Sequence, residues 1–226
     1  MHPSVVTSVP YYAQWESPEL VRRIVTGGLA AREDPMWPRS GADSAEEYEW
    51  WAVRLCGMAC LRMVLHHWRG TAPPALALAR ECTEAGAYVV HPDRVDGLIY
   101  APFAAYVRHR WQLDAVVETD LDPAGLRARL DAGHLVMISV HPGIRTLDAA
   151  PPGRGGHLVL AVGHTEDALL IHNPSGWADT GTQRSAPVPW EDLDRFFARR
   201  GVTLVNPGPS APPSAPAPEA GDGRRA

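Results

Sequence analysis

The hydrophobic pattern of the chain changes its period after residue 134, and this change limits the possible folds more than any other feature. Before that point apolar residues recur at helical spacing. After it come three compact apolar runs: LVMISV at 135–140, LVLAV at 158–162 and ALLIH at 168–172, with a last short strand at 202–205. Because helices come first and the short turn at 165–167 joins two of the runs, the sequence predicts an α+β fold with a C-terminal antiparallel sheet.

Glycine and proline signals divide the N-terminal part into helices. The clearest helix spans 56–68, where the helical spacing of apolar residues ends at Trp68 and Gly70 follows as a stop. Further helices are predicted over 17–25, 45–53, 74–84, 102–110 and 122–132, and residues 5–14 are expected to form a short strand or an extended arm.

Composition indicates one globular domain. The chain is 45% hydrophobic and 21% charged, its net charge is −5, and all 21 of its basic residues are arginine. The sequence contains no basic cluster and no long apolar stretch, so nucleic-acid and membrane partners are not expected. A lysine Schiff base is excluded. After residue 206 proline, alanine, serine and glycine dominate, which predicts a domain at 1–206 and a disordered tail at 207–226.

The cysteines and the first residues of the chain indicate in which cellular compartment the protein is expected. The three cysteines form no C-x-x-C pair, and an odd number argues against a disulfide framework or a cysteine zinc site. The first residues lack the basic segment and apolar run of a secretory signal. We therefore expect a cytoplasmic protein without a cofactor.

Cys56 is the first candidate nucleophile, because it lies where the clearest helix begins. The helix N-terminus favours a thiolate there, and Gly57 allows another chain to approach closely. That effect is at most about 2 kcal/mol, or roughly 1.5 pKa units, so the thiol still needs a partner. Cys60 and Cys82 lie deeper in their helices and fit the role of small buried apolar residues.

His157 is the most distinctive of the ten histidines, because it follows two glycines and opens a strand. If 158–162 and 168–172 pair across their short turn, Asn173 returns beside His157. A nucleophile, a base and an orienting amide would then come together in the order Cys56, His157, Asn173. Taken singly, His157 could be a plain strand-start histidine and Asn173 a turn residue.

Three blocks of the sequence resemble the C39-like cysteine peptidases, a branch of the papain-like superfamily: VPYYAQ at 9–14, CGMACLRMVL at 56–65 and GGHLVLAVGHTEDALLIHNPSG at 155–176. The resemblance implies a papain-like fold, with Cys56 as nucleophile, His157 as general base and Asn173 as the orienting residue. It also implies that Gln14 lies in the oxyanion hole. In the family this glutamine comes close before the cysteine. Residues 15–55 therefore look like an aromatic-rich insertion, which would either cap the cleft or pack on the core.

The sequence thus predicts a cysteine-dependent hydrolase that acts on a peptide or acyl substrate inside the cell. Two alternatives stay open. The same residues could transfer the acyl group to an amine, as an acyltransferase or cyclase does, or the scaffold could bind peptides without catalysis. A metal site built from His66, His67 and His141 lacks the spacing typical of zinc enzymes. The oligomeric state is left undetermined.

Overall fold

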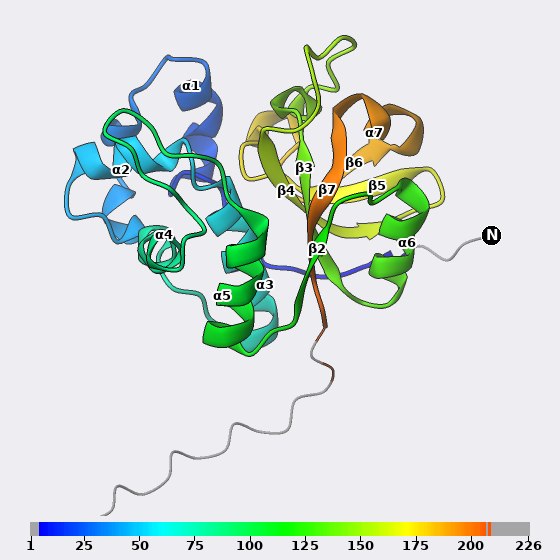
Figure 1. Cartoon of the computed structure of the whole chain (residues 1–226). Coiled ribbons are helices and arrows are strands. Elements are labelled where there is room, and N and C mark those ends of the chain that lie inside the picture. The colour runs from blue at the N-terminus through cyan, green and yellow to red at the C-terminus, as the bar shows by residue number, and fades with distance from the viewer. Residues whose placement is uncertain (1–4, 207, 209–226) are drawn as a thin grey trace, which may run out of the picture.

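The computed structural model describes residues 5–206 and 208, so the tail predicted at 207–226 lies, apart from residue 208, outside the described residues. The elements form two halves (Figure 1). Helices α1 to α5 gather on one side, and most of the sheet lies on the other side with α6 and α7. Helix α3 lies at the boundary and packs against both α4 and β4. None of the helices among the described residues is long and apolar enough to cross a membrane.

The helical half confirms the helices predicted there. Ser44 caps α2 by accepting a hydrogen bond from the backbone N–H of Glu47 at 3.1 Å. Gly70 ends α3 in the left-handed conformation that glycine adopts without strain, with φ 76°. The elements of this half are η1 (Pro18–Leu20), α1 (Val21–Val25), η2 (Ala31–Glu33), η3 (Trp37–Ser40), α2 (Ala45–Ala52), α3 (Cys56–Arg69), α4 (Ala75–Glu84) and α5 (Tyr100–Trp111).

The aromatic residues of segment 15–55 pack on the core. Trp15, Tyr48 and Trp51 are buried in the same hydrophobic cluster as α3, and Trp37 and Trp50 pack against that cluster from outside. The structure therefore shows these aromatic residues packing on the core, which is one of the two roles considered for the segment. The end of the segment still reaches the cavity described below.

The sheet is antiparallel throughout, as the sequence predicts. Its strands follow the order β2-β7-β3-β4-β5-β6, and β1 pairs with β4 beside this path. The elements are β1 (Val5–Val6), β2 (Ala115–Glu118), α6 (Pro123–Asp131), β3 (Leu135–Val140), η4 (Pro142–Arg145), β4 (His157–His164), β5 (Ala168–His172), η5 (Ala178–Thr180), β6 (Ala186–Pro189), α7 (Trp190–Phe196) and β7 (Phe197–Leu204).

Both faces of the sheet are covered, and this explains why its central strands are continuous apolar runs. In β3, Leu135 and Met137 join the core shared with the helical half. The alternate residues Val136, Ile138 and Val140 join a second core with α6 and α7. Because successive side chains of a strand point to opposite faces, a strand buried on both sides is apolar at nearly every position.

The sequence prediction missed β2, β6 and α7. Strands β2 and β6 lie at the two ends of the strand order, and β6 contains Pro187 and Pro189, which weaken any strand pattern. Helix α7 is only 7 residues long, too short for a clear helical period. Strand β7 also begins earlier than the predicted 202–205.

Candidate active site

Cys56 is the first residue of α3, as predicted, and its side chain is half-buried. The preceding residue makes no side-chain cap, so the first N–H groups of the helix lack a capping acceptor from that residue. Gly57 lets the start of α3 lie close to the segments that contain Leu98 and Leu158. A Cβ atom at position 57 would lie 2.9 Å from Leu98 Cδ2 and 3.3 Å from Leu158 Cδ1. The glycine thus lets the side chains of Leu98 and of Leu158 in β4 pack closely against the start of α3.

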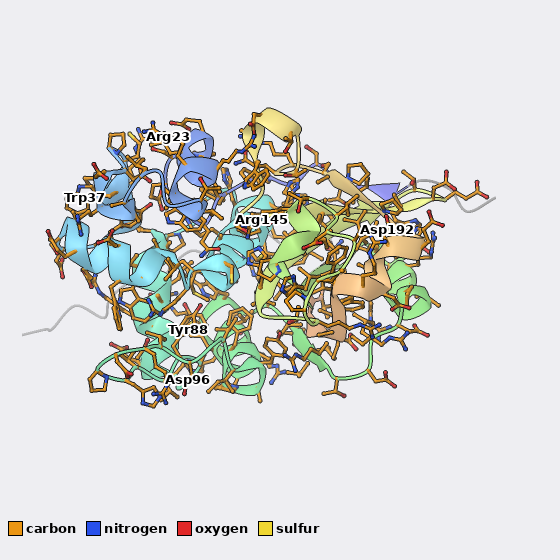
Figure 2. All side chains as sticks on the ribbon, turned by 90° about the horizontal axis from the view of Figure 1, so that it is seen from above. Arg23, Trp37, Tyr88, Asp96, Arg145 and Asp192 are labelled. Carbon is orange, nitrogen blue, oxygen red and sulfur yellow. The ribbon has the colours of Figure 1, made fainter. Side chains whose placement is uncertain are left out.

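Cys56 and His157 line one cavity of about 470 Å³ between the two halves. Tyr88 and Asp96, labelled in Figure 2, belong to its helical side. The walls contain both apolar and charged side chains, so a peptide segment could be held there by either kind of contact. The lining residues are Val53, Arg54, Cys56, Tyr88, Val95, Asp96, Gly97, Leu98 and Tyr100 from the helical half, and Ser139, Gly156, His157, Leu158 and Arg200 from the sheet.

His157 and Asn173 are brought together by the β4–β5 hairpin. Leu160 pairs with His172 in this hairpin, so the chain leaving β5 runs back toward the start of β4. His157 Nε2 lies 2.9 Å from Asn173 Oδ1, and both side chains are buried. Since the amide oxygen only accepts, Nε2 carries the proton, and Nδ1 is the nitrogen left to take a proton from a thiol.

Ser175 and Arg145 extend this pair, and the sequence predicts no contact of either residue with the histidine. Ser175 Oγ lies 3.0 Å from His157 Nε2 and 3.3 Å from Asn173 Oδ1. The backbone N–H of Ser175 donates to the same Oδ1 at 3.0 Å. Arg145, labelled in Figure 2, donates to Ser175 Oγ at 2.9 Å. The sequence NPSG after β5 indicates that Ser175 lies in a turn, but no pattern in the neighbouring sequence indicates that its partner is Arg145 in η4.

Gln14 is buried beside the same hairpin. Its backbone N–H donates to the carbonyl of Pro174 at 2.8 Å, and its side-chain Nε2 donates to the carbonyl of Ala52 at 2.8 Å. The glutamine thus bridges the turn after Asn173 and the end of α2, shortly before Cys56. Gln14 itself is not among the residues that line the cavity. Its amide has a second N–H, which an oxyanion could use only if the side chain reaches the cleft.

Burial dominates the electrostatics of the candidate pair. Desolvation raises the pKa of the Cys56 thiol, against the smaller effects of the backbone of Leu158 in β4 and of the backbone of Gly57 and Cys56 at the helix start, which lower it. Desolvation also lowers the pKa of His157 to about 4, opposed by the hydrogen bond to Asn173 and assisted by the positive charge of Arg145. The helix start thus lowers the pKa of the Cys56 thiol in the expected direction, but burial outweighs it. At neutral pH the resting pair consists of a neutral thiol and a neutral imidazole.

The other cysteines and histidines lie elsewhere. Cys60 and Cys82 are fully buried, and Cys60 Sγ contacts the carbonyl of Leu158 at 3.8 Å. His66 Nδ1 pairs with the Tyr12 hydroxyl at 2.9 Å, and His141 Nδ1 accepts from a backbone N–H at 3.0 Å. Across the part of the chain that the structure describes, no three His, Cys, Asp or Glu side chains gather where they could hold a metal ion.

This α+β arrangement of helices and antiparallel sheet is shared with a solved C39-like peptidase. The chain belongs to the Peptidase_C39 like family, because the family model matches residues 6–202. No curated protein matches the chain.

Three solved structures resemble the fold at low sequence identity. A C39-like peptidase from Bacillus anthracis has a TM-score of 0.57 at 15% identity, over 91% of this chain and 98% of that one. A double glycine motif protease from an AMS/PCAT transporter, in complex with a leader peptide, has a TM-score of 0.47 at 15% identity, over 91% and 100%. The peptidase domain of Streptococcus ComA has a TM-score of 0.46 at 14% identity, over 68% and 92%.

Proposed function

We propose that the protein is a cysteine-dependent hydrolase that cleaves an amide bond of a peptide substrate, with Cys56 as nucleophile and His157 as general base. One observation carries the proposal. Cys56 and His157 line the same cavity, and the Nε2 atom of His157 is held by Asn173, which leaves Nδ1 for the thiol proton. Family membership supports the reaction class.

The proposed reaction begins from the neutral pair. Cys56 Sγ attacks the scissile carbonyl while its proton moves to His157 Nδ1, which avoids a preformed ion pair in a buried site. The backbone N–H groups at the start of α3 are offered to the oxyanion, and Gln14 is proposed as a further donor. The imidazolium returns the proton to the leaving amine. Water then attacks the thioester with His157 again as base, the carbon–sulfur bond breaks, and the proton returns from His157 to the Cys56 sulfur.

Cytoplasmic location remains part of the proposal. All three cysteines are free thiols, which suits a reducing compartment.

The test compares Cys56→Ala with Cys60→Ala. Each variant is incubated with iodoacetamide, the alkylated residue is identified by peptide mass spectrometry, and cleavage of a proteome-derived peptide library is followed by sequencing new termini. We expect cleavage and labelling to disappear in Cys56→Ala only. Labelling that depends on Cys60, or cleavage that survives Cys56→Ala, contradicts the assignment. Product formed only with an added amine would indicate acyl transfer in place of hydrolysis.

A further inference from the structure

We propose that the cavity beside Cys56 is a subsite for an acidic side chain of the substrate, whose carboxylate binds Arg200. The inference rests on the proposed function, because it assumes that the substrate chain passes Cys56. It names the chemical class of one substrate residue.

Arg200 is an exposed residue of β7, and its guanidinium lies beside the segment that precedes β4. A Cβ atom at Gly155 would lie 3.3 Å from Arg200 Nη2 and 3.0 Å from Ser139 Oγ. The guanidinium therefore lies against the backbone of Gly155, two positions before His157. Gly155 has φ 84°, and the lack of a side chain leaves this space to the arginine.

Tyr100 lines the same cavity as Arg200 and the candidate nucleophile Cys56. Burial raises the pKa of the Tyr100 hydroxyl. The side chains of Ser139 and Arg200 lower this pKa by a smaller amount, and the charge of Cys56 raises it slightly. All four residues line the cavity. A substrate side chain that enters beside Cys56 thus comes within reach of the guanidinium.

The charge of Arg200 is not matched by an acid. Among residues 5–206, no carboxylate lies within ion-pair distance of its guanidinium. Its neighbour Arg199 pairs with Asp194 at 3.3 Å. Within the same described range, Asp96 is the one acid that lines the cavity, and it is held by His91 at 2.9 Å and Arg94 at 3.3 Å.

The second arginine of the cavity is differently placed. Arg54 stacks on the ring of Trp50, 4.3 Å from its centroid, and donates to the Trp50 backbone carbonyl. Its guanidinium is therefore already occupied by a ring and a carbonyl. Arg200 is left as the group that can give a carboxylate a charge-assisted, two-point contact. The apolar walls from Val95 and Leu98 suit the methylene groups of a glutamate.

The test uses four N-acetyl dipeptide chloromethyl ketones, with Glu or Gln at either position and Gly at the other. The second-order rate of Cys56 alkylation is measured by intact mass for the native protein, Arg200→Gln and Arg199→Gln. We expect one Glu probe to react about tenfold faster than its Gln partner in the native protein, as a hydrogen-bonded charge pair predicts. The preference should vanish in Arg200→Gln, persist in Arg199→Gln and shrink at high salt.

The outcomes separate the two proposals. If Glu and Gln probes alkylate Cys56 equally, or if the preference survives Arg200→Gln, the acidic subsite is refuted and the proposed nucleophile stands. If no probe alkylates Cys56, the proposed function fails and this inference fails with it.

Discussion

Replacing Asn173 with aspartate should raise the pKa of His157 from about 4 to near neutrality. Asn173 Oδ1 lies 2.9 Å from His157 Nε2, and the backbone N–H of Ser175 also donates to Oδ1. The other amide atom, Asn173 Nδ2, is buried without a hydrogen-bond partner among the described residues. The carboxylate introduced by Asn173→Asp therefore fits the same space, keeps the donors to Oδ1 and loses no hydrogen bond.

The magnitude follows from Coulomb's law. A carboxylate and an imidazolium in hydrogen-bond contact have charge centres about 4 Å apart, which gives about 4 kcal/mol at an effective dielectric constant of about 20, or roughly 3 pKa units. Burial holds the pKa of His157 at about 4 in the native protein, so the substitution should bring it close to neutrality. The charge of Arg145, which donates to Ser175 at 2.9 Å, helps to keep the new carboxylate ionised.

The assay is an NMR titration of the histidine Cε1–H signals, with His157→Gln used to assign the resonance. Below its new pKa, His157 becomes an imidazolium beside Cys56, which favours the thiolate, so iodoacetamide should alkylate Cys56 faster at pH 6 in Asn173→Asp than in the native protein. An unchanged or lower His157 pKa in the variant would refute the reasoning, because it would mean that the carboxylate and the ring do not interact as the structure places them.

Three further predictions concern stability and are measured by urea unfolding. Ser175→Ala removes the acceptor of a buried Arg145 hydrogen bond and should lower the free energy of unfolding by about 1–3 kcal/mol, whereas Thr180→Ala, on the exposed neighbouring turn, should change it little. Gly201→Ala would place a Cβ atom 2.0 Å from the Met137 carbonyl oxygen in the next strand, so β7 must move away from β3; we expect a loss of at least about 3 kcal/mol, and a stable, unaltered variant would contradict the register. Acidification should also destabilise the fold. The pKa of His157 is about 4 in the folded protein and about 6.5 in the unfolded chain, so the unfolded chain binds more protons between these two pH values. The free energy of unfolding should therefore fall by up to about 3 kcal/mol as the pH is lowered from about 6.5 to about 4. His157→Gln should flatten that slope, and an unchanged slope would show that another group causes it.

The elements that the sequence predicted well are those with a local signature. The helix at 56–68 carries its own apolar period and its own glycine stop, and the runs at 135–140 and 168–172 became strands with the same bounds. The contact between His157 and Asn173 could also be predicted from the sequence, because a short turn between two strands determines which of their residues lie opposite each other. Gln14 was placed by resemblance alone, and the structure puts its side chain on Ala52.

Other features depend on contacts between distant segments. Arg145 and Ser175 are 30 residues apart, and no local pattern links a 3₁₀ turn after β3 to the turn after β5. The position of Arg200 beside Gly155 depends on β7 pairing with β3, and the start of β7 was not predicted.

The sequence by itself determined the order of helices and strands, the helix-start cysteine and the hairpin that joins histidine to asparagine, because each follows from side-chain periodicity and turn length over a few residues. Only the tertiary structure decided the protonation of Cys56 and His157, since the pKa of each group depends on how completely distant segments exclude water from it. The arginines around the site were likewise placed by packing across the sheet, which the linear order of residues does not encode.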